Sequence, residues 1–340
     1  IILIDARYGV QVQTKRHSFI ASLLGIKHFI VAINKMDLVE HSEATYNRIK
    51  QDYTEFVQGL GERDIQFVPM SALNGDNVVK TSKNMDWYQG ETLLALLETV
   101  TLENDTTDNG VRLPVQYVNR PNLDFRGFCG TLAAGTINVG DAITVLPSGK
   151  TSTVKSIVTF DGELDSASQG QAVTLTLNDE VDVSRGDMIV TGILPHVSQG
   201  ASAKLVWMGE KPLELNRQYD LKIASKKTQV SVTQLNHLIN VNTLAQEDAN
   251  SLALNEVGQV ELHFAERLAF DLYTDVRDTG GFILIDRLTN VTIAAGMIEN
   301  AVDSELASHE FGEFELEFNA LVRKHFPHWQ ALDISALKGK

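Results

Sequence analysis

The first hundred residues alternate between continuous apolar runs and segments with apolar residues at helical spacing. Three apolar runs have the length of strands, at residues 1–6, 28–33 and 65–70. Three other segments carry the helical pattern, at residues 13–24, 42–60 and 92–100. Strands that are apolar on both faces and joined by helices predict a parallel sheet covered on both sides. Such a sheet binds its ligands at the carboxyl ends of its strands.

The pattern changes from about Val111 onward. Short alternating segments separated by Gly and Asp replace the helical spacing, which predicts a small closed β-barrel. A second series of such segments begins near residue 200, and the polar stretch 194–203 is expected to join the two barrels. Helical spacing returns at residues 314–329, so we expect a terminal helix.

Charge and composition narrow the classes of protein. A net charge of −15 over 340 residues argues against a broad nucleic-acid-binding face, because phosphate contacts need clustered Lys and Arg. The apolar runs are too short to cross a bilayer, and the first residues lack the order of a signal peptide. The single cysteine cannot form an internal disulfide. We therefore expect a soluble cytoplasmic protein with no nucleic-acid or membrane partner.

Two short motifs directly follow the second and third predicted strands and can read a guanine ring. In the first motif, the Asp37 carboxylate can accept hydrogen bonds from N1 and N2 of guanine, which adenine cannot supply in that arrangement. Asn34 can bridge the ring edge to the backbone, and the stem of Lys35 can lie along the ring face. In the second motif, Ser71, Ala72 and Leu73, a backbone N–H near Ala72 can donate to O6. The strand context, more than the motif letters, makes guanine recognition the favoured interpretation.

The motifs that hold phosphates are missing from the sequence. No GxxxxGK[ST] occurs, and the nearest string, LPSGKT at residues 146–151, lies between alternating segments that predict a hairpin turn. Two strings match Asp-x-x-Gly, from Asp124 and Asp278, but both follow the guanine motif and lie outside the α/β region. We reject both as phosphate sensors. The expectation is that the chain is incomplete and begins inside a nucleotide-binding domain.

Three long strings carry a family resemblance: LIDARYGVQVQTKRHSFIASLLGIKHFIVAINKMDLV, VQYVNRPNLDFRGFCGTLAAGTINVGD and ELEFNALVRKHFPHW. The chain resembles the GTPase subunit, or large subunit, of two-subunit bacterial sulfate adenylyltransferase (ATP sulfurylase), within the translation-factor-type GTPases. The resemblance implies a multidomain α/β plus all-β protein: the C-terminal half of a P-loop GTPase α/β domain followed by two translation-factor-type β-barrels. The expected domains are a remnant of the GTP-binding domain, two barrels and a tail with a helix, at residues 1–107, 108–199, 200–300 and 301–340.

The resemblance also implies a function. The subunit would couple GTP hydrolysis to the synthesis of adenosine 5′-phosphosulfate from ATP and sulfate by a small catalytic subunit, with adenylylsulfate kinase as a further candidate partner. GTP would be its cofactor, with Mg²⁺ held through residues missing from this chain. Asn34, Lys35, Asp37 and the loop 71–73 carry over as guanine-reading residues, whereas no catalytic or metal-binding residue can be named. The chain alone is expected to be inactive as a GTPase.

Two alternatives remain open at this point. A translation elongation factor that binds aminoacyl-tRNA would have nearly the same architecture, and a GTP-responsive scaffold without enzymatic activity is the other. The strings RPNLDFRG and HFPHW argue against the first alternative. The polar loop 119–126 is favoured as a functional loop. His325 and His328 are interpreted as part of a structural tail, because a closed zinc site needs four ligands.

Overall fold

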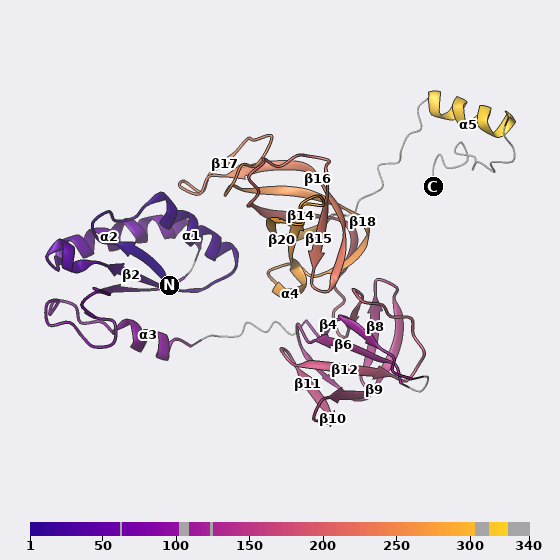
Figure 1. Cartoon of the computed structure of the whole chain (residues 1–340), viewed down its shortest axis with the longest axis horizontal. Coiled ribbons are helices and arrows are strands. Elements are labelled where there is room, and N and C mark those ends of the chain that lie inside the picture. Colours follow the sequence, from indigo (N-terminus) through magenta and orange to yellow (C-terminus); the bar gives the residue numbers. More distant parts are fainter. Residues whose placement is uncertain (62, 102–108, 123–124, 303–312, 326–340) are drawn as a thin grey trace.

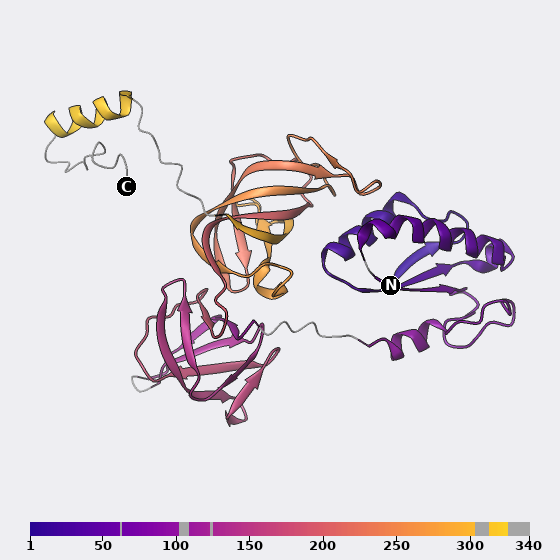
Figure 2. The same ribbon diagram turned by 180° about the vertical axis from the view of Figure 1, so that it is seen from behind.

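The computed structural model describes residues 1–61, 63–101, 109–122, 125–302 and 313–325. Within these ranges the chain forms an α/β domain, two β-barrels and a C-terminal helix (Figure 1). Seen from both sides, the second barrel lies beside the α/β domain and beside the first barrel (Figures 1 and 2). The α/β plus all-β class predicted from the sequence is therefore confirmed.

The α/β domain is built on three parallel strands in the order β1-β2-β3. The strands are β1 (Ile2–Asp5), β2 (His28–Asn34) and β3 (Asp64–Pro69). The helices are α1 (Val12–Leu23), α2 (Glu43–Val57) and α3 (Leu93–Thr99), with two 3₁₀ turns, η1 (Met36–Val39) and η2 (Gln58–Leu60). Ser42 and Thr92 begin α2 and α3, because each side chain accepts a backbone N–H of the first turn.

Helices cover both faces of this sheet, as the strand pattern predicts. On one face, Val31 and Ile33 of β2 are fully buried against Ile49 and Tyr53 of α2 and against α1. On the other face, Ile30, Ala32, Val68 and Met70 pack against Leu93 and Leu96 of α3. β2 is buried on both sides and has no room for polar side chains in its interior, so its polar residues, His28 and Asn34, lie at its two ends.

The first barrel wraps around a core of buried Val, Leu and Ile side chains. Its strands are β4 (Arg112–Pro114), β5 (Tyr117–Asn119), β6 (Gly127–Thr131), β7 (Thr136–Asn138), β8 (Ala142–Leu146), β9 (Lys150–Thr159), β10 (Gly162–Leu164), β11 (Ser166–Ser168), β12 (Ala172–Leu177) and β13 (Met188–Val190). The main sheet has the order β4-β13-β8-β9-β12-β6-β5. Antiparallel pairing of β8 with β9 confirms the hairpin predicted for LPSGKT, in which Gly149 has the positive φ (74°) that a tight turn requires.

The second barrel is closed. Its strands are β14 (His196–Trp207), β15 (Gln218–Ile223), β16 (Lys226–Ile239), β17 (Gln246–Glu247), β18 (Val257–Phe270), β19 (Gly281–Ile285) and β20 (Thr292–Val302). The order β15-β19-β20-β14-β18-β16 returns to β15 through the β15–β16 pairing. A short helix, α4 (Arg277–Gly280), precedes β19, and α5 (Glu313–His325) follows the barrels.

The stretch 194–203 is not a joint over most of its length, because β14 starts at His196. The small polar residues of this stretch resemble those of a loop. In the structure they form a β-bulge, where the register shifts between Ser198 and Gly200 and the strand bends. The change from one barrel to the next therefore falls upstream of His196. Leu123 and Asp124 of the loop 119–126, and His328 with most of the HFPHW string, lie outside the described residues.

The second barrel makes apolar and polar contacts with the α/β domain. Val206, Val257 and Met297 of the barrel belong to the same buried cluster as β1, α1 and α2. At the end of α1, the Arg277 guanidinium donates to the carbonyl of Gly25 at 2.9 Å. The α/β domain and the second barrel thus share one buried cluster and a polar contact after the end of α1.

Candidate guanine-nucleotide site

The structure brings the two predicted motifs together at the carboxyl edge of the sheet. Asn34 is the last residue of β2, and its Oδ1 accepts the backbone N–H of Ala72 at 2.9 Å. The hydroxyl of Ser71 donates to Oδ1 of Asp37 at 2.6 Å. Asp37 and Ser71 are 34 positions apart in the sequence, and Asn34 and Ala72 are 38 positions apart. The two hydrogen bonds form because parallel neighbouring strands end at the same edge of the sheet.

Backbone geometry fixes the first motif. Lys35 adopts a left-handed conformation with φ of 65°, and its N–H donates to the Oδ1 of Asn34 at 2.8 Å. This sharp turn leads directly into η1, whose first residue, Met36, is fully buried and donates its N–H to the carbonyl of Met70. Asp37 therefore lies on a short turn that is hydrogen-bonded through Met36 to Met70, the residue before the second motif.

The hydrogen bonds of the second loop leave one backbone donor available. The N–H of Ala72 is bonded to Asn34, and those of Asn74 and Gly75 are bonded to the hydroxyl and the carbonyl of Ser71. Within the described residues, the N–H of Leu73 donates to no protein acceptor. The sequence suggested a donor near Ala72, and the geometry favours the next residue of the loop.

Apolar and charged side chains surround these polar groups. Leu73 is 87% exposed and Leu38, on η1, is 56% exposed, so each offers bare apolar surface beside the loops. Exposed apolar side chains of this kind suit the face of a purine ring, because ligand sites combine apolar contacts with a few hydrogen bonds. The Lys35 ammonium lies 2.8 Å from Oδ2 of Asp5, the last residue of β1.

Asp5 and Arg7 were not among the residues that the motifs identified. Asp5 lies opposite Asn34 in the register of β1 and β2, and it accepts two hydrogen bonds from the Arg7 guanidinium and one from the Arg7 N–H. These bonds to Arg7, together with the one from Lys35, hold the pKa of the Asp5 carboxyl well below its usual range. The available sequence signal was a carboxylate at the carboxyl end of an apolar strand.

The strings that were rejected as phosphate motifs do not belong to these loops in the described part of the chain. LPSGKT lies in the first barrel, and Asp278 belongs to α4 of the second barrel, whereas Asp124 lies outside the described residues. In the described part of the chain, no group of three or more His, Cys, Asp or Glu is gathered to hold a metal ion. The residues assembled here fit the base of a nucleotide, and they do not fit a magnesium ion.

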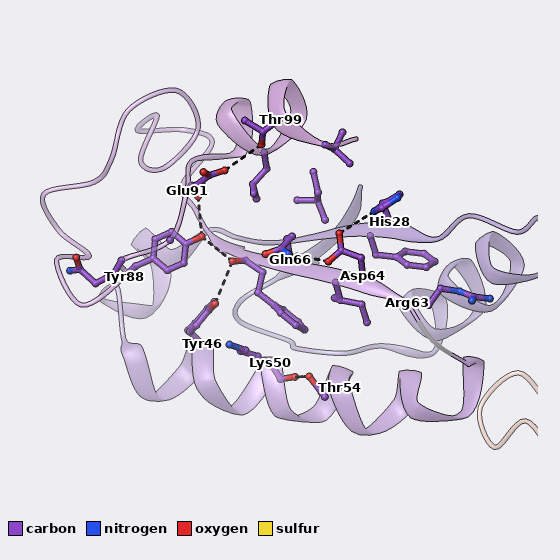
Figure 3. Close-up of a pocket in the computed structure, with 18 of the residues that line it drawn as sticks. His28, Tyr46, Lys50, Thr54, Arg63, Asp64, Gln66, Tyr88, Glu91 and Thr99 are labelled. Carbon is purple, nitrogen blue, oxygen red and sulfur yellow. Dashed lines mark hydrogen bonds and ion pairs between the residues drawn. The ribbon is translucent and has the colours of Figure 1, made fainter. Parts of the chain in front are cut away.

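A cavity in the α/β domain is separate from the two loops. It has a volume of about 1140 Å³ and lies between β3, α2 and α3, and none of the six predicted residues lines it (Figure 3). At one end, the hydroxyls of Tyr46 and Tyr88 both donate to the carbonyl of Phe67, at 3.4 and 3.0 Å. Burial raises the pKa of each tyrosine to about 12, so both hydroxyls stay protonated at neutral pH. These bonds cap the edge of β3, and the cavity is given no role in base recognition.

No helix in the described ranges is both long enough and apolar enough to span a membrane.

Residues 1–103 match the family described as the elongation factor Tu GTP binding domain, and residues 200–299 match the family described as GTP-eEF1A C-terminal domain-like. A crystal structure of sup35 complexed with GDP is similar in fold, with a TM-score of 0.54 at 24% identity; the alignment covers 88% of this chain and 78% of sup35.

Curated relatives match almost the whole chain. Sulfate adenylyltransferase subunit 1 of Shewanella oneidensis is 59% identical over 344 aligned residues, which cover 99% of this chain and 71% of the relative. The same subunit of Aeromonas salmonicida is 59% identical over 98% of this chain and 71% of the relative. This identity extends through the α/β domain and both barrels, and the chain therefore belongs to the family of sulfate adenylyltransferase subunit 1.

Proposed function

We propose that this protein is the GTPase subunit of a two-subunit sulfate adenylyltransferase. It couples GTP hydrolysis to the formation of adenosine 5′-phosphosulfate from ATP and sulfate, a reaction carried out by a small catalytic partner in the cytoplasm. The observation that carries the proposal is the 59% identity with sulfate adenylyltransferase subunit 1 over 99% of the chain. The translation-factor alternative has less support, since the 24% identity with sup35 shows the fold alone.

In this proposal, guanine enters the loops at the carboxyl edge of the sheet. Asp37 accepts hydrogen bonds from N1 and N2, and the hydroxyl of Ser71 fixes its carboxylate in place. The N–H of Leu73 donates to O6, where adenine carries an amine in place of an acceptor. Asn34 ties the two loops together, and the stem of Lys35 lies along the ring face.

The barrels transmit the nucleotide state to the partner. A GTPase changes the positions of its loops when the terminal phosphate is lost, and a rigid neighbour turns that local change into a movement of a whole domain. The second barrel shares a buried cluster with α1, α2 and β1, so it is suited to this role. An adenylylsulfate kinase is a second partner consistent with the proposal, because it consumes the product.

Mg²⁺, when bound with GTP, would supply positive charge that offsets the negative charge developing on the phosphates during hydrolysis. The residues assigned above contact the base, and none of them is placed to hold that ion. We therefore expect the 340-residue chain by itself to show no multiple-turnover GTP hydrolysis. Measurement of phosphate release from GTP by the purified chain tests this expectation, and turnover above the buffer rate contradicts it.

The experiment for the proposed function uses the natural gene product, expressed with its genomic neighbours and purified through this subunit. Pyrophosphate release from ATP is measured with and without sulfate, and with GTP, GDP or no guanine nucleotide. The proposal predicts a sulfate-dependent rate that rises with GTP and needs a co-purifying small subunit. If the rate shows no sulfate dependence and GTP instead promotes retention of aminoacyl-tRNA, the translation-factor alternative replaces the proposal.

A further inference from the structure

Asp5 lies within ion-pair distance of Lys35, the side chain assigned to the face of the guanine ring. β1 and β2 are neighbouring parallel strands, and their last residues, Asp5 and Asn34, are paired in register. The next residue, Lys35, turns through a left-handed conformation and brings its ammonium to within 2.8 Å of Oδ2 of Asp5. The stem of Lys35 thus starts at the end of β2 and is tied at its tip to the end of β1.

A second cation holds the Asp5 carboxylate in a fixed plane. Arg7 donates from Nε to Oδ1 at 3.0 Å and from its terminal nitrogen to Oδ2 at 2.7 Å, and its backbone N–H adds a third bond at 3.0 Å. A two-pronged guanidinium–carboxylate contact fixes orientation as well as distance. Oδ2 also receives the Lys35 ammonium. Asp5 is therefore an oriented anchor for Lys35.

The anchor matters because a lysine side chain has many rotamers. An exposed Lys loses considerable conformational freedom when it is held in one arrangement, and a ligand that must order it binds more weakly. Lys35 is 46% exposed, so packing alone does not hold it. A carboxylate that fixes its tip orders the stem before the base arrives.

We propose that Asp5 is a positioning residue for guanine recognition, which acts by tethering the ammonium of Lys35 so that its stem is preorganised along the face of the ring. This inference rests on the proposed guanine site, and it adds a residue outside the two motifs that define that site. Asp5 makes no contact with the base in this account. Its whole effect on binding passes through Lys35.

A double-mutant cycle tests this dependence. GMP is titrated into the 340-residue chain by ligand-observed NMR, with AMP as the comparison, because a monophosphate reports mainly on the base and sugar. Asp5→Ala and Lys35→Met, which keeps an apolar stem without the ammonium, are each expected to weaken GMP binding about fivefold. The double variant is expected to bind GMP as well as Lys35→Met alone, since Asp5 then has nothing to hold.

Two further variants make the result interpretable. Asp64→Ala removes a carboxylate from the start of β3, where it pairs with His28 at 3.0 Å, and it should leave GMP affinity within about twofold of the original chain. Asp37→Ala should abolish the preference for GMP over AMP. Thermal unfolding of every variant checks that the domain is folded.

The outcomes separate the two proposals. Additive losses in the double variant, or an Asp5→Ala chain that binds GMP normally while Asp37→Ala does not, overturn the role of Asp5 and leave the guanine site standing. A chain that binds AMP as well as GMP, or an Asp37→Ala variant that behaves like the original, overturns the guanine site and the role of Asp5 with it.

Discussion

Two carboxylate–cation pairs in this protein have similar lengths and opposite surroundings. Lys35 and Asp5 lie 2.8 Å apart at the sheet edge, and their side chains are 46% and 22% exposed. Arg112 of the first barrel and Asp271 of the second lie 3.0 Å apart, and their side chains are 1% and 5% exposed. The first pair is partly exposed to solvent beside the candidate site, whereas the second is buried between the two barrels.

The buried pair is surrounded by further hydrogen bonds. Arg112 donates from Nε and a terminal nitrogen to Asp271, and from its other terminal nitrogen to the carbonyls of Asn109 and Val111. The hydroxyl of Thr279 adds a bond to Asp271 at 2.6 Å. This full set of hydrogen bonds is needed because burying a charge lowers the stability of the fold unless protein groups replace the hydrogen bonds lost to water.

The difference between the pairs indicates how the molecule divides its tasks. The buried pair joins the two barrels in one arrangement, so they are expected to move as a unit. The exposed pair is partly screened by water, so it adds little to the stability of the fold, and its role is to order Lys35 at the site. Charge is used for rigidity between the barrels and for positioning one side chain at the site.

The largest expected effect comes from breaking the buried pair. Asp271→Ala leaves the Arg112 guanidinium buried without its counter-charge, and should lower the free energy of unfolding by about 3–5 kcal/mol. Urea unfolding followed by circular dichroism measures this loss. The folded fraction should still prefer GMP over AMP, since the base loops are in another domain.

An exposed pair in the first barrel is the matched control. Arg126 and Asp182 lie 3.2 Å apart with 30% and 84% exposure, and Asp182→Ala should change the free energy of unfolding by less than about 0.5 kcal/mol. Equal losses for Asp271→Ala and Asp182→Ala would remove the distinction between buried and exposed pairs.

The next effect is on base selectivity. Asp37→Asn replaces a carboxylate that accepts from N1 and N2 by an amide that donates one hydrogen bond, and should weaken GMP binding about 30-fold. The same amide can donate to the carbonyl at C2 of xanthine, so XMP should bind better than GMP. NMR titration with both nucleotides checks the reversal, and unchanged GMP affinity excludes Asp37 from base recognition.

A smaller effect is expected at the O6 donor. Leu73→Pro removes the one loop N–H that the hydrogen bonds of residues 72–75 leave available, and should weaken GMP binding about tenfold. Leu73→Ala keeps that N–H and serves as the control, with a smaller loss from the missing apolar contact. If the two variants weaken GMP binding equally, the Leu73 N–H is not the donor.

The smallest effect concerns pH. Because the bonds from Arg7 and Lys35 lower the pKa of Asp5 in the folded protein, the ionised carboxylate stabilises the fold above the unfolded value of about 3.9. This contribution is lost as the pH falls through the lower folded pKa. Asp5→Asn should therefore reduce the free energy of unfolding by less than about 1 kcal/mol at pH 7. The difference should shrink below about pH 4 in chemical unfolding series; a constant difference down to pH 2 contradicts the role of the charge.

Local patterns predicted the elements that depend on local chemistry. The parallel sheet followed from apolar runs, and the meeting of residues 34–37 with residues 71–73 followed from the rule that parallel strands end together. The hairpin at residues 146–151 followed from alternation and a Gly turn.

The contacts that escaped prediction depend on long-range pairing. Arg112 and Asp271 are 159 positions apart, and no periodicity in either segment indicates the other. The bond between Lys35 and Asp5 required the register of β1 on β2, which the sequence did not specify. The bulge in β14 resembled a loop because its small polar residues are also the residues of turns.

The most direct test of the central claim combines base reading with sulfate activation. The natural gene product with Asp37→Asn is purified with its small subunit, and sulfate-dependent pyrophosphate release from ATP is measured with GTP and with XTP. The account predicts that GTP no longer stimulates the reaction at concentrations that suffice for the original protein, and that XTP does. Stimulation by GTP at the original concentration, with no response to XTP, would contradict the claim that these loops read the nucleotide that drives the enzyme.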